Sequence, residues 1–276
     1  MTHSTALIHY TLHLADDGLI LGHRNSEWTG HGPILEQDIA LSNIALDLIG
    51  QARNFYQYAA ELINIGGLSG PSNISNPAMG PGLSDGPRSP VTEDQLAYLR
   101  DGWDFKNCLL VEQGNGDWAK TILRQFLFSA YQTTLYEKLA QSRDKTLAAI
   151  AAKSYKEGVY HLRWSSEWVI RLGDGTEESH TRMNNALDEL WKFTGELHTA
   201  ATYELETAAK AISPDLSTLQ PLWKEKVKEV FDEAGITYPP SVWMQTGGKE
   251  GRHTEHLGYV LAEMQFLQRA YPGCEW

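Results

Sequence analysis

The sequence predicts an all-α protein in which long helices are joined by short loops. Apolar residues recur at three- and four-residue steps in most segments, the spacing that places them on one face of a helix. No segment shows the sustained alternation of apolar and polar residues that a half-buried strand would show. We find no internal repeat and no linker, so the 276 residues are expected to form one domain, 1–276.

The longest expected helix covers residues 33–62. It begins at Pro33, a favoured first helical position because the missing N–H needs no partner there. Its apolar residues lie on nearly all sides, which predicts burial by a bundle alone or together with a second chain. Polar residues follow one edge of the main apolar face: Glu36, Asn43, Asp47, Gln51 and Asn54. A buried carboxylate is costly without a partner, so Asp47 is expected to be paired, hydrogen-bonded or bound to a metal.

The remaining helices follow in order along the chain. Residues 5–22 are expected to form a helix with an interruption at Gly18. A capping box at Thr92 to Gln95 opens a helix that pauses at Gly102 and continues to about Asn115. Further helices are expected over residues 117–142, 145–172, 177–210, 214–234 and 254–270.

Residues 64–90 interrupt this series. They are crowded with Gly, Pro, Ser and Asn and have no periodicity. The segment is too long for an ordinary connection, so a flexible insertion loop is expected. An ordered lid is the alternative, although the segment carries no residue typical of catalysis.

The composition excludes several classes of protein. A net charge of −12 argues against non-specific binding to nucleic acid, which needs a basic surface, but leaves room for a local pocket that binds a small anion. The two cysteines cannot form a disulfide framework, which indicates a reducing, cytoplasmic compartment. The sequence has neither a signal peptide nor an apolar run of about 18 residues, so we expect neither secretion nor a membrane span.

Two motifs have the outline of a metal site. Helix bundles that activate oxygen bind two metals through single carboxylates on two helices and a Glu-x-x-His pair on each of two others. Residues i and i+3 lie on one helical face, so each pair converges on one point. Here Glu112-x-x-Asn115 has an amide in place of the imidazole, and Gly158-x-x-His161 lacks the carboxylate. Glu157 is one residue away, about 100° round the helix, and points elsewhere.

Four segments carry a resemblance to a known family: ALSNIALDLIGQARN, LLVEQGNG, KEGVYHLRWS and TGGKEGRHTEHLGYVLAEMQFLQR. They resemble the C subunits of bacterial phenylacetyl-CoA 1,2-epoxidases, over residues 7–276, and the last motif is highly specific. The main departure is the insertion at 64–90. The resemblance implies a ferritin-like helical bundle with additional C-terminal helices, acting as a non-catalytic structural subunit of a multicomponent monooxygenase.

In that family a related A subunit is the catalytic partner and holds a di-iron site. The resemblance therefore implies that the A subunit binds phenylacetyl-CoA and epoxidises its ring in phenylacetate degradation, with FAD, an Fe–S cluster and NADPH in a reductase subunit. No catalytic residue, cofactor or metal is expected in this chain. The A-type ligands Glu, Glu, His, Asp, Glu and His fall on these positions: Asp47, Glu112, Asn115, Ser129, Gly158 and His161.

These six positions predict a vestige of a metal site. Three of them have lost a useful donor. The remaining Asp47, Glu112 and His161 are expected to form a hydrogen-bonded polar core, satisfied in part by the neutral amide and hydroxyl nearby. A mononuclear metal site and a self-sufficient di-metal oxidase with an unusual ligand set are the alternatives.

The histidines near the C-terminus invite a zinc interpretation. Metalloprotease histidines are four residues apart with an intervening Glu, whereas His253 and His256 are three apart. We therefore expect a helix start here, with Thr254 as the N-cap.

Two other motifs favour ordinary structural roles. Gly247-Gly248-Lys249 lacks the spacing of a phosphate-binding loop and predicts a tight turn with an exposed lysine. The tryptophans at 164, 168 and 191 occupy helical positions typical of a core or an interface.

The segment from Trp103 to Asn107 precedes Glu112, and a lysine beside an aromatic residue there is suited to the phosphates and adenine of an acyl-CoA. By resemblance, this segment and the stretch 205–207 lie close to the CoA part of the substrate. The candidate substrate-binding residues are Asp104, Phe105, Lys106, Asn107, Leu205, Glu206 and Thr207. An ordinary interface or surface turn is the alternative.

Overall fold

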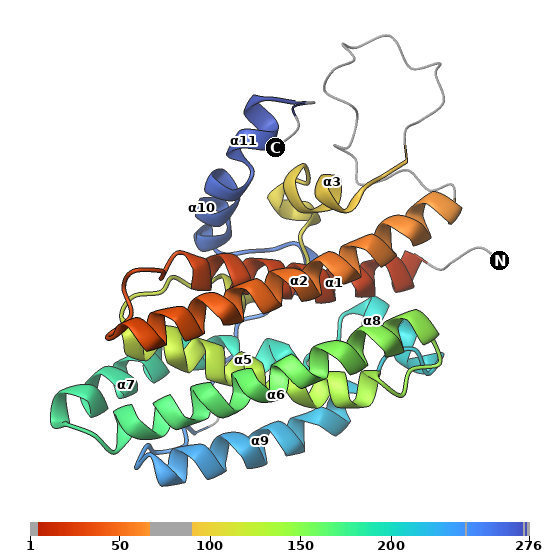
Figure 1. Cartoon of the computed structure of the whole chain (residues 1–276). Helices are drawn as coiled ribbons and strands as arrows, with labels where there is room; N and C mark the ends of the chain where they lie inside the picture. The colour runs from red at the N-terminus through yellow and green to blue at the C-terminus, as the bar shows by residue number, and fades with distance from the viewer. Residues whose placement is uncertain (1–4, 67–89, 241, 273, 275–276) are drawn as a thin grey trace.

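The structure is a computed structural model of the chain, and it describes residues 5–66, 90–240, 242–272 and 274. Within these ranges every regular element is a helix, which confirms the all-α prediction. Two helix hairpins form the core (Figure 1). They are α1 (Thr5–Ser26) with α2 (Leu35–Gly66), and α5 (Trp118–Leu139) with α6 (Lys145–Gly173). Packed against each other, they make the expected ferritin-like bundle.

Shorter helices surround this core. Two of them, α7 and α9, cover the α5–α6 hairpin, whereas α3, α10 and α11 stand beside the α1–α2 hairpin on its other side (Figure 1). The α-helices are α3 (Glu93–Tyr98), α4 (Leu109–Glu112), α7 (Glu177–Leu190), α8 (Thr202–Ala209), α9 (Leu216–Glu233), α10 (Glu255–Met264) and α11 (Phe266–Ala270). The 3-10 turns are η1 (Gly102–Asp104), η2 (Trp191–Phe193), η3 (Gly195–His198) and η4 (Gly248–Glu250).

Among the four long helices of the core, α1 is the most deeply buried, with 18 of its 22 residues buried. It contacts α2, α4, α8 and α10, so the bundle is organised around α1 rather than around the longer α2. The predicted interruption at Gly18 is wrong, because α1 continues through it. A Cβ at Gly18 would lie 3.1 Å from the carbonyl oxygen of Leu48, and one at Gly22 would lie 2.9 Å from Ile49. The two glycines therefore allow α2 to pack closely on α1.

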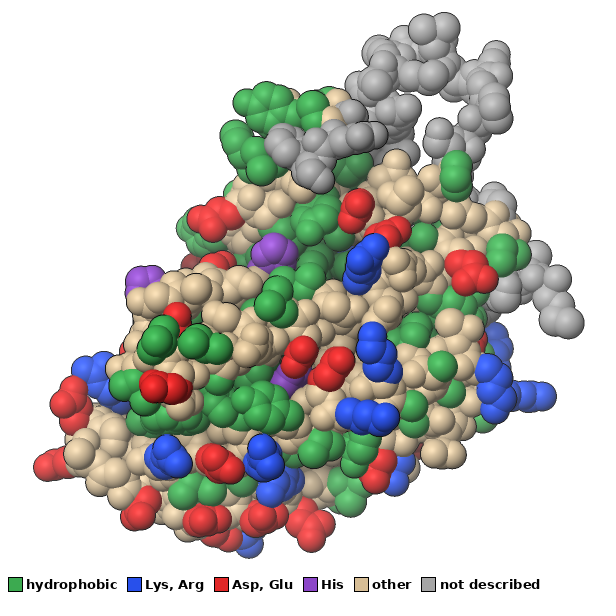
Figure 2. All heavy atoms as spheres, viewed as in Figure 1, with side chains coloured by type: hydrophobic (Ala, Val, Ile, Leu, Met, Phe, Trp, Pro, Cys, Tyr) green, Lys and Arg blue, Asp and Glu red, His purple; other side chains and the backbone are tan. Residues whose placement is uncertain are grey.

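The apolar residues on the outer side of α2 remain uncovered. Leu35 and Leu46 are 70% and 66% exposed, and Ile39 is also more than half exposed, as is Ile34, which directly precedes the helix. Figure 2 shows apolar side chains over α2 on this face of the molecule. We call these four residues the α2 strip. The described residues of this chain therefore do not bury α2 on all the sides that the sequence predicts.

Other boundaries differ from the sequence-based expectation. The long helix predicted over 177–210 is broken into α7 and α8 by the turns η2 and η3, and the one predicted over 92–115 is reduced to α3, η1 and α4. The last helix is divided at Gln265. The capping box at Thr92 is confirmed. Residues 64–66 belong to α2, and most of the expected insertion, residues 67–89, lies outside the described residues.

In the part of the chain that the structure describes, no helix is both long and apolar enough to cross a membrane.

Candidate functional site

A row of polar contacts joins α2 to α6. Nε2 of His161 lies 3.0 Å from Oδ2 of Asp47, and Nε2 of Gln51 donates to Glu157 over 2.8 Å. Toward the N-terminus of α2, the side-chain carbonyl oxygen of Gln37 accepts hydrogen bonds from the indoles of Trp164 and Trp168. Both tryptophans thus serve the packing of α2 on α6, in line with their predicted structural role.

Asp47 and His161 form the expected pair, but not in a sealed core. The Asp47 side chain is 38% exposed, whereas His161 is fully buried. Nδ1 of His161 has no hydrogen-bond partner among the described residues. Water can therefore reach the carboxylate, which reduces the cost of separating the pair.

Glu112 does not join Asp47 and His161, so the predicted three-residue cluster is wrong in this respect. The two Glu112 oxygens instead accept four hydrogen bonds. They come from the backbone N–H of Thr254 (2.7 Å), the hydroxyl of Thr254 (2.7 Å), the amide of Asn107 (2.9 Å) and Nδ1 of His253 (2.8 Å). Burial alone would lower the pKa of His253, but the hydrogen bond to Glu112 and its charge outweigh burial and raise that pKa.

The other vestigial positions are also occupied by protein contacts. The Asn115 amide nitrogen donates to the backbone oxygen of Arg24 over 2.8 Å, and its oxygen accepts from Arg124 over 2.6 Å. The Ser129 hydroxyl accepts a hydrogen bond from Gln125. A Cβ at Gly158 would lie 3.4 Å from the hydroxyl of Thr133, so a larger side chain there would press on α5.

These side chains do not fit a dinuclear metal site. Both Glu112 oxygens are already saturated by protein donors, Asn115 offers an amide held by two arginines, and Gly158 offers no ligand. Among the described residues, no three His, Cys, Asp or Glu side chains are placed to hold a metal ion. The bundle pattern requires two Glu-x-x-His pairs and two further carboxylates, and this chain retains neither pair intact.

Sequence reasoning missed a set of buried charges on α1. Asp16 accepts hydrogen bonds from the Tyr56 hydroxyl and the Lys106 backbone N–H, and it forms a fully buried ion pair with Arg100. The next residue, Asp17, accepts from the backbone N–H of Cys108 over 2.7 Å. The only signal in the sequence was the occurrence of two adjacent aspartates inside an apolar helix.

A second buried pair ties the C-terminal segment to α8. Nζ of Lys249 lies 3.1 Å from Oε2 of Glu204, and both side chains are 3% exposed. The predicted exposure of Lys249 is therefore wrong. The carboxylate of Glu196 supports the same turn by accepting from the backbone N–H of Gly247 (2.6 Å) and of Leu109 (2.7 Å).

The segment with His253 and His256 is a helix start, as expected. Thr254 is the N-cap of α10, but its hydroxyl donates to Glu112 instead of capping the helix. Arg24 anchors the same turn by donating to the backbone oxygen of His256 over 3.0 Å. The two histidines thus belong to a tertiary junction between α1, α4 and α10.

The family model of the phenylacetic acid catabolic protein matches residues 1–276. The curated C subunit of the 1,2-phenylacetyl-CoA epoxidase of Escherichia coli (strain K12) is 45% identical over 267 residues, which cover 97% of this chain and 98% of that protein. The chain belongs to the phenylacetic acid catabolic protein family.

Residues 103–107 and 205–207 are the two segments expected, by resemblance, to lie near the CoA part of the substrate. They lie close together. Nζ of Lys106 stands over the ring of Tyr203, 5.6 Å from its centre, at the start of α8. Phe105, Asn107 and Thr207 are buried, whereas Leu205 and Glu206 are exposed and Asp104 and Lys106 are half-buried. Burial lowers the pKa of Lys106. Burial and the charge of Lys106 together lower the pKa of His9 to about 4.

Proposed function

We propose that this chain is the non-catalytic structural subunit of a phenylacetyl-CoA 1,2-epoxidase and that it pairs with the di-iron catalytic A subunit in aerobic phenylacetate degradation. The observation that carries the proposal is the loss of ligands at the vestigial metal positions. Where a metal would need a carboxylate or an imidazole, Asn115 binds two arginines, Ser129 binds a glutamine and Gly158 has no side chain.

In this proposal the oxygen chemistry takes place in another chain. One oxygen atom is inserted across the 1,2 bond of the aromatic ring, with O2 and NADPH-derived electrons delivered by a reductase subunit. This chain supports the fold and assembly of the A subunit. Its buried ion pairs suit that role, because a rigid bundle offers the partner a preformed surface.

The α2 strip is the proposed surface for the A subunit. Exposed apolar side chains at helical spacing are typical of an obligate interface, which commonly buries upwards of about 2,000 Å². Val159 and Tyr160 of α6 are also exposed and extend the apolar area beyond the row of contacts between α2 and α6. The strip therefore belongs to a wider face rather than to a single helix.

Co-expression tests this proposal directly. A tagged A subunit should retain this chain through purification, and the pair with its reductase should epoxidise phenylacetyl-CoA, whereas this chain alone should be inactive. Leu46→Glu should abolish co-purification and activity. Leu222→Glu, the same change at an exposed leucine of α9, should leave both intact.

Iron analysis separates the proposal from a self-sufficient oxidase. The chain expressed alone in iron-rich medium should carry no stoichiometric iron after a chelator wash. About two irons per chain, the content of a dinuclear bundle site, would contradict the structural role, as would an A subunit that is fully active without this chain.

We further propose that Lys106 helps to position the CoA part of the substrate at the edge of the complex. Lys106 is half-buried, and its ammonium stands over the ring of Tyr203, where an anionic phosphate would gain a partly desolvated partner. Lys106→Ala should raise the KM of the assembled enzyme for phenylacetyl-CoA without changing kcat. The exposed Lys228→Ala is the control, and an unchanged KM in Lys106→Ala would refute this role.

A further inference from the structure

The C-terminal helices α10 and α11 present a second exposed face, separate from the α2 strip. Their inner side packs through Leu257, Val260 and Met264. The helical hydrogen bonds continue across the boundary at Gln265, because its N–H donates to Leu261 and its oxygen accepts from Arg269. The two helices therefore act as one arm, residues 255–270, with a continuous outer face (Figure 1).

Five residues follow the outer face of this arm at steps of three, four, four and three: Glu255, Gly258, Ala262, Phe266 and Arg269. All five are exposed, and this spacing places them in one stripe opposite the buried side. The Phe266 ring is 61% exposed. A Cβ at Gly258 would have no atom within 4 Å.

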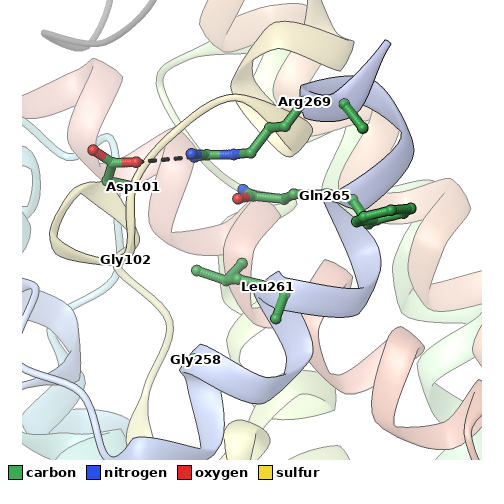
Figure 3. A pocket seen from close by; sticks show the side chains of 9 residues that line it. Asp101, Gly102, Gly258, Leu261, Gln265 and Arg269 are labelled. Carbon is green, nitrogen blue, oxygen red and sulfur yellow. Dashed lines mark hydrogen bonds and ion pairs between the residues drawn. The ribbon is translucent and has the colours of Figure 1, made fainter.

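A hollow of about 470 Å³ lies beside the stripe, between the arm and the 101–102 turn. Figure 3 shows Leu261, Gln265 and Arg269 directed from the arm toward Asp101 and Gly102. Gly258, Ala262 and Phe266 of the stripe also line the hollow. One helix face thus carries both a protruding aromatic side chain and an open space next to a glycine.

We propose that this arm pairs with the same arm of a second copy of the chain, antiparallel and related by a twofold axis at Ala262. In such a pair, a residue that follows Ala262 in one copy lies opposite the residue that precedes Ala262 by the same number of positions in the second copy. Phe266, four residues after Ala262, then lies opposite Gly258, four residues before it. Glu255 and Arg269, each seven residues away, lie opposite one another.

The self-complementarity of the stripe favours a second copy over an unrelated partner. A twofold interface uses one patch twice, so every contact must occur in two symmetric copies. Here the aromatic group meets the glycine space twice and a carboxylate meets a guanidinium twice. Ala262 at the crossing point permits close approach, since interaxial distances shorten when contact side chains are small.

Arg269 has donors available for this contact. Its described bonds to Leu99 O, Arg100 O and Asp101 Oδ1 all use Nη2, and the side chain is 43% exposed. A helix pair of this length buries less than the roughly 1,200 Å² of a stable complex. The expected dimer is therefore weak and concentration-dependent.

Cross-linking tests the register. In a Cys274→Ser background, Ala262→Cys should form a disulfide-linked dimer under mild oxidation, because the twofold axis brings the two Cα atoms within about 7 Å, as a disulfide requires. Glu263→Cys, the next residue and outside the stripe, is the matched control. Equal cross-linking of the two variants would overturn the proposal.

Sedimentation velocity over a concentration series tests the chemistry. Phe266→Ala should raise the dimer dissociation constant at least about tenfold, as expected for loss of a buried aromatic anchor. Glu255→Arg and Arg269→Glu should each weaken the dimer, and the double exchange should restore it, while Glu263→Arg should have no effect. Circular dichroism of each variant confirms folding. A chain that remains monomeric at about 100 µM, or a double exchange no better than the singles, would overturn the twofold arrangement.

Discussion

The buried pair of Lys249 and Glu204 offers a sharp test of what holds the C-terminal segment in place. Lys249→Met removes the charge and retains the length of the side chain. The change strands Glu204, which would keep a hydrogen bond from the backbone N–H of Ala201 over 2.8 Å but lose its cation. The backbone oxygens of Leu197 and Thr199 would also lose a donor.

The magnitude follows from the burial of both partners. Breaking a buried pair by removing one partner costs about 3–5 kcal/mol, because the other charge remains uncompensated. At about 2–4 °C per kcal/mol for a chain of this size, the melting temperature should fall by roughly 6–20 °C. Lys226→Met is the matched control. Its pair with Glu229 is exposed, so the cost should stay below about 1 kcal/mol.

Urea and thermal unfolding followed by tryptophan fluorescence measure both effects. The double variant Lys249→Met/Glu204→Gln should recover part of the loss, since a glutamine can still accept from Ala201 and carries no stranded charge. Wild-type stability in Lys249→Met, or a double variant whose loss equals the sum of the two single losses, would refute the reasoning.

Three further predictions concern the bundle and its junctions. Asp47→Ala should lower the free energy of unfolding by only about 1 kcal/mol, since the carboxylate is partly solvated, and thermal melts showing a loss several times larger would contradict this. His253→Gln should matter most at low pH. Because the folded pKa of His253 lies above its ordinary 6.5, its stabilisation is fully present below that pH and is lost as the pH rises through the folded pKa, so urea midpoints of wild type and variant should converge on going to alkaline pH. Gly22→Leu should destabilise the protein by forcing α1 away from α2. Gly50→Ala, at an open helical position, should raise the free energy of unfolding by about 0.5–1 kcal/mol. A higher melting temperature for Gly22→Leu than for Gly50→Ala would contradict the packing argument.

The helices with strong periodicity were predictable from sequence. The expected 117–142 and 145–172 correspond to α5 and α6 within three residues at each end, because each has a continuous apolar face and an aspartate N-cap. Local chemistry also determined the capping box at Thr92. In these segments the propensity of the chain and its tertiary contacts favour the same structure.

The failures arose where distant residues decide the local structure. The helix expected over 177–210 breaks near Glu196, whose carboxylate binds backbone groups at 109 and 247, and nothing in the local sequence reports those contacts. Lys249 was expected in solvent because its partner, Glu204, lies 45 residues away.

The candidate site was predictable only in part. Asp47 and His161 meet as expected. Both belong to long helices whose apolar periodicity determines which side faces the neighbouring helix. Glu112 was misassigned because its partners His253 and Thr254 approach from α10, an element outside the four-helix pattern. The spacing of a motif predicts which face a residue occupies, but not which later segment covers that face.

The position of α1 at the centre of the bundle has a consequence for biosynthesis. This helix leaves the ribosome before the partners of its polar groups do, and the carbonyl that accepts from Arg24 follows it by 232 residues. At about 5–20 residues per second, α1 waits roughly 10 to 50 seconds for that contact.

During this interval Arg24 keeps part of its hydration, because its hydrogen bond to the backbone oxygen of His256 forms only when the C-terminal segment arrives. A nascent chain halted before α10 should therefore hold α1 loosely and remain open to proteases and chaperones. Synthesis of α10 then commits α1 to the core, so only chains that include α10 present a finished surface for assembly.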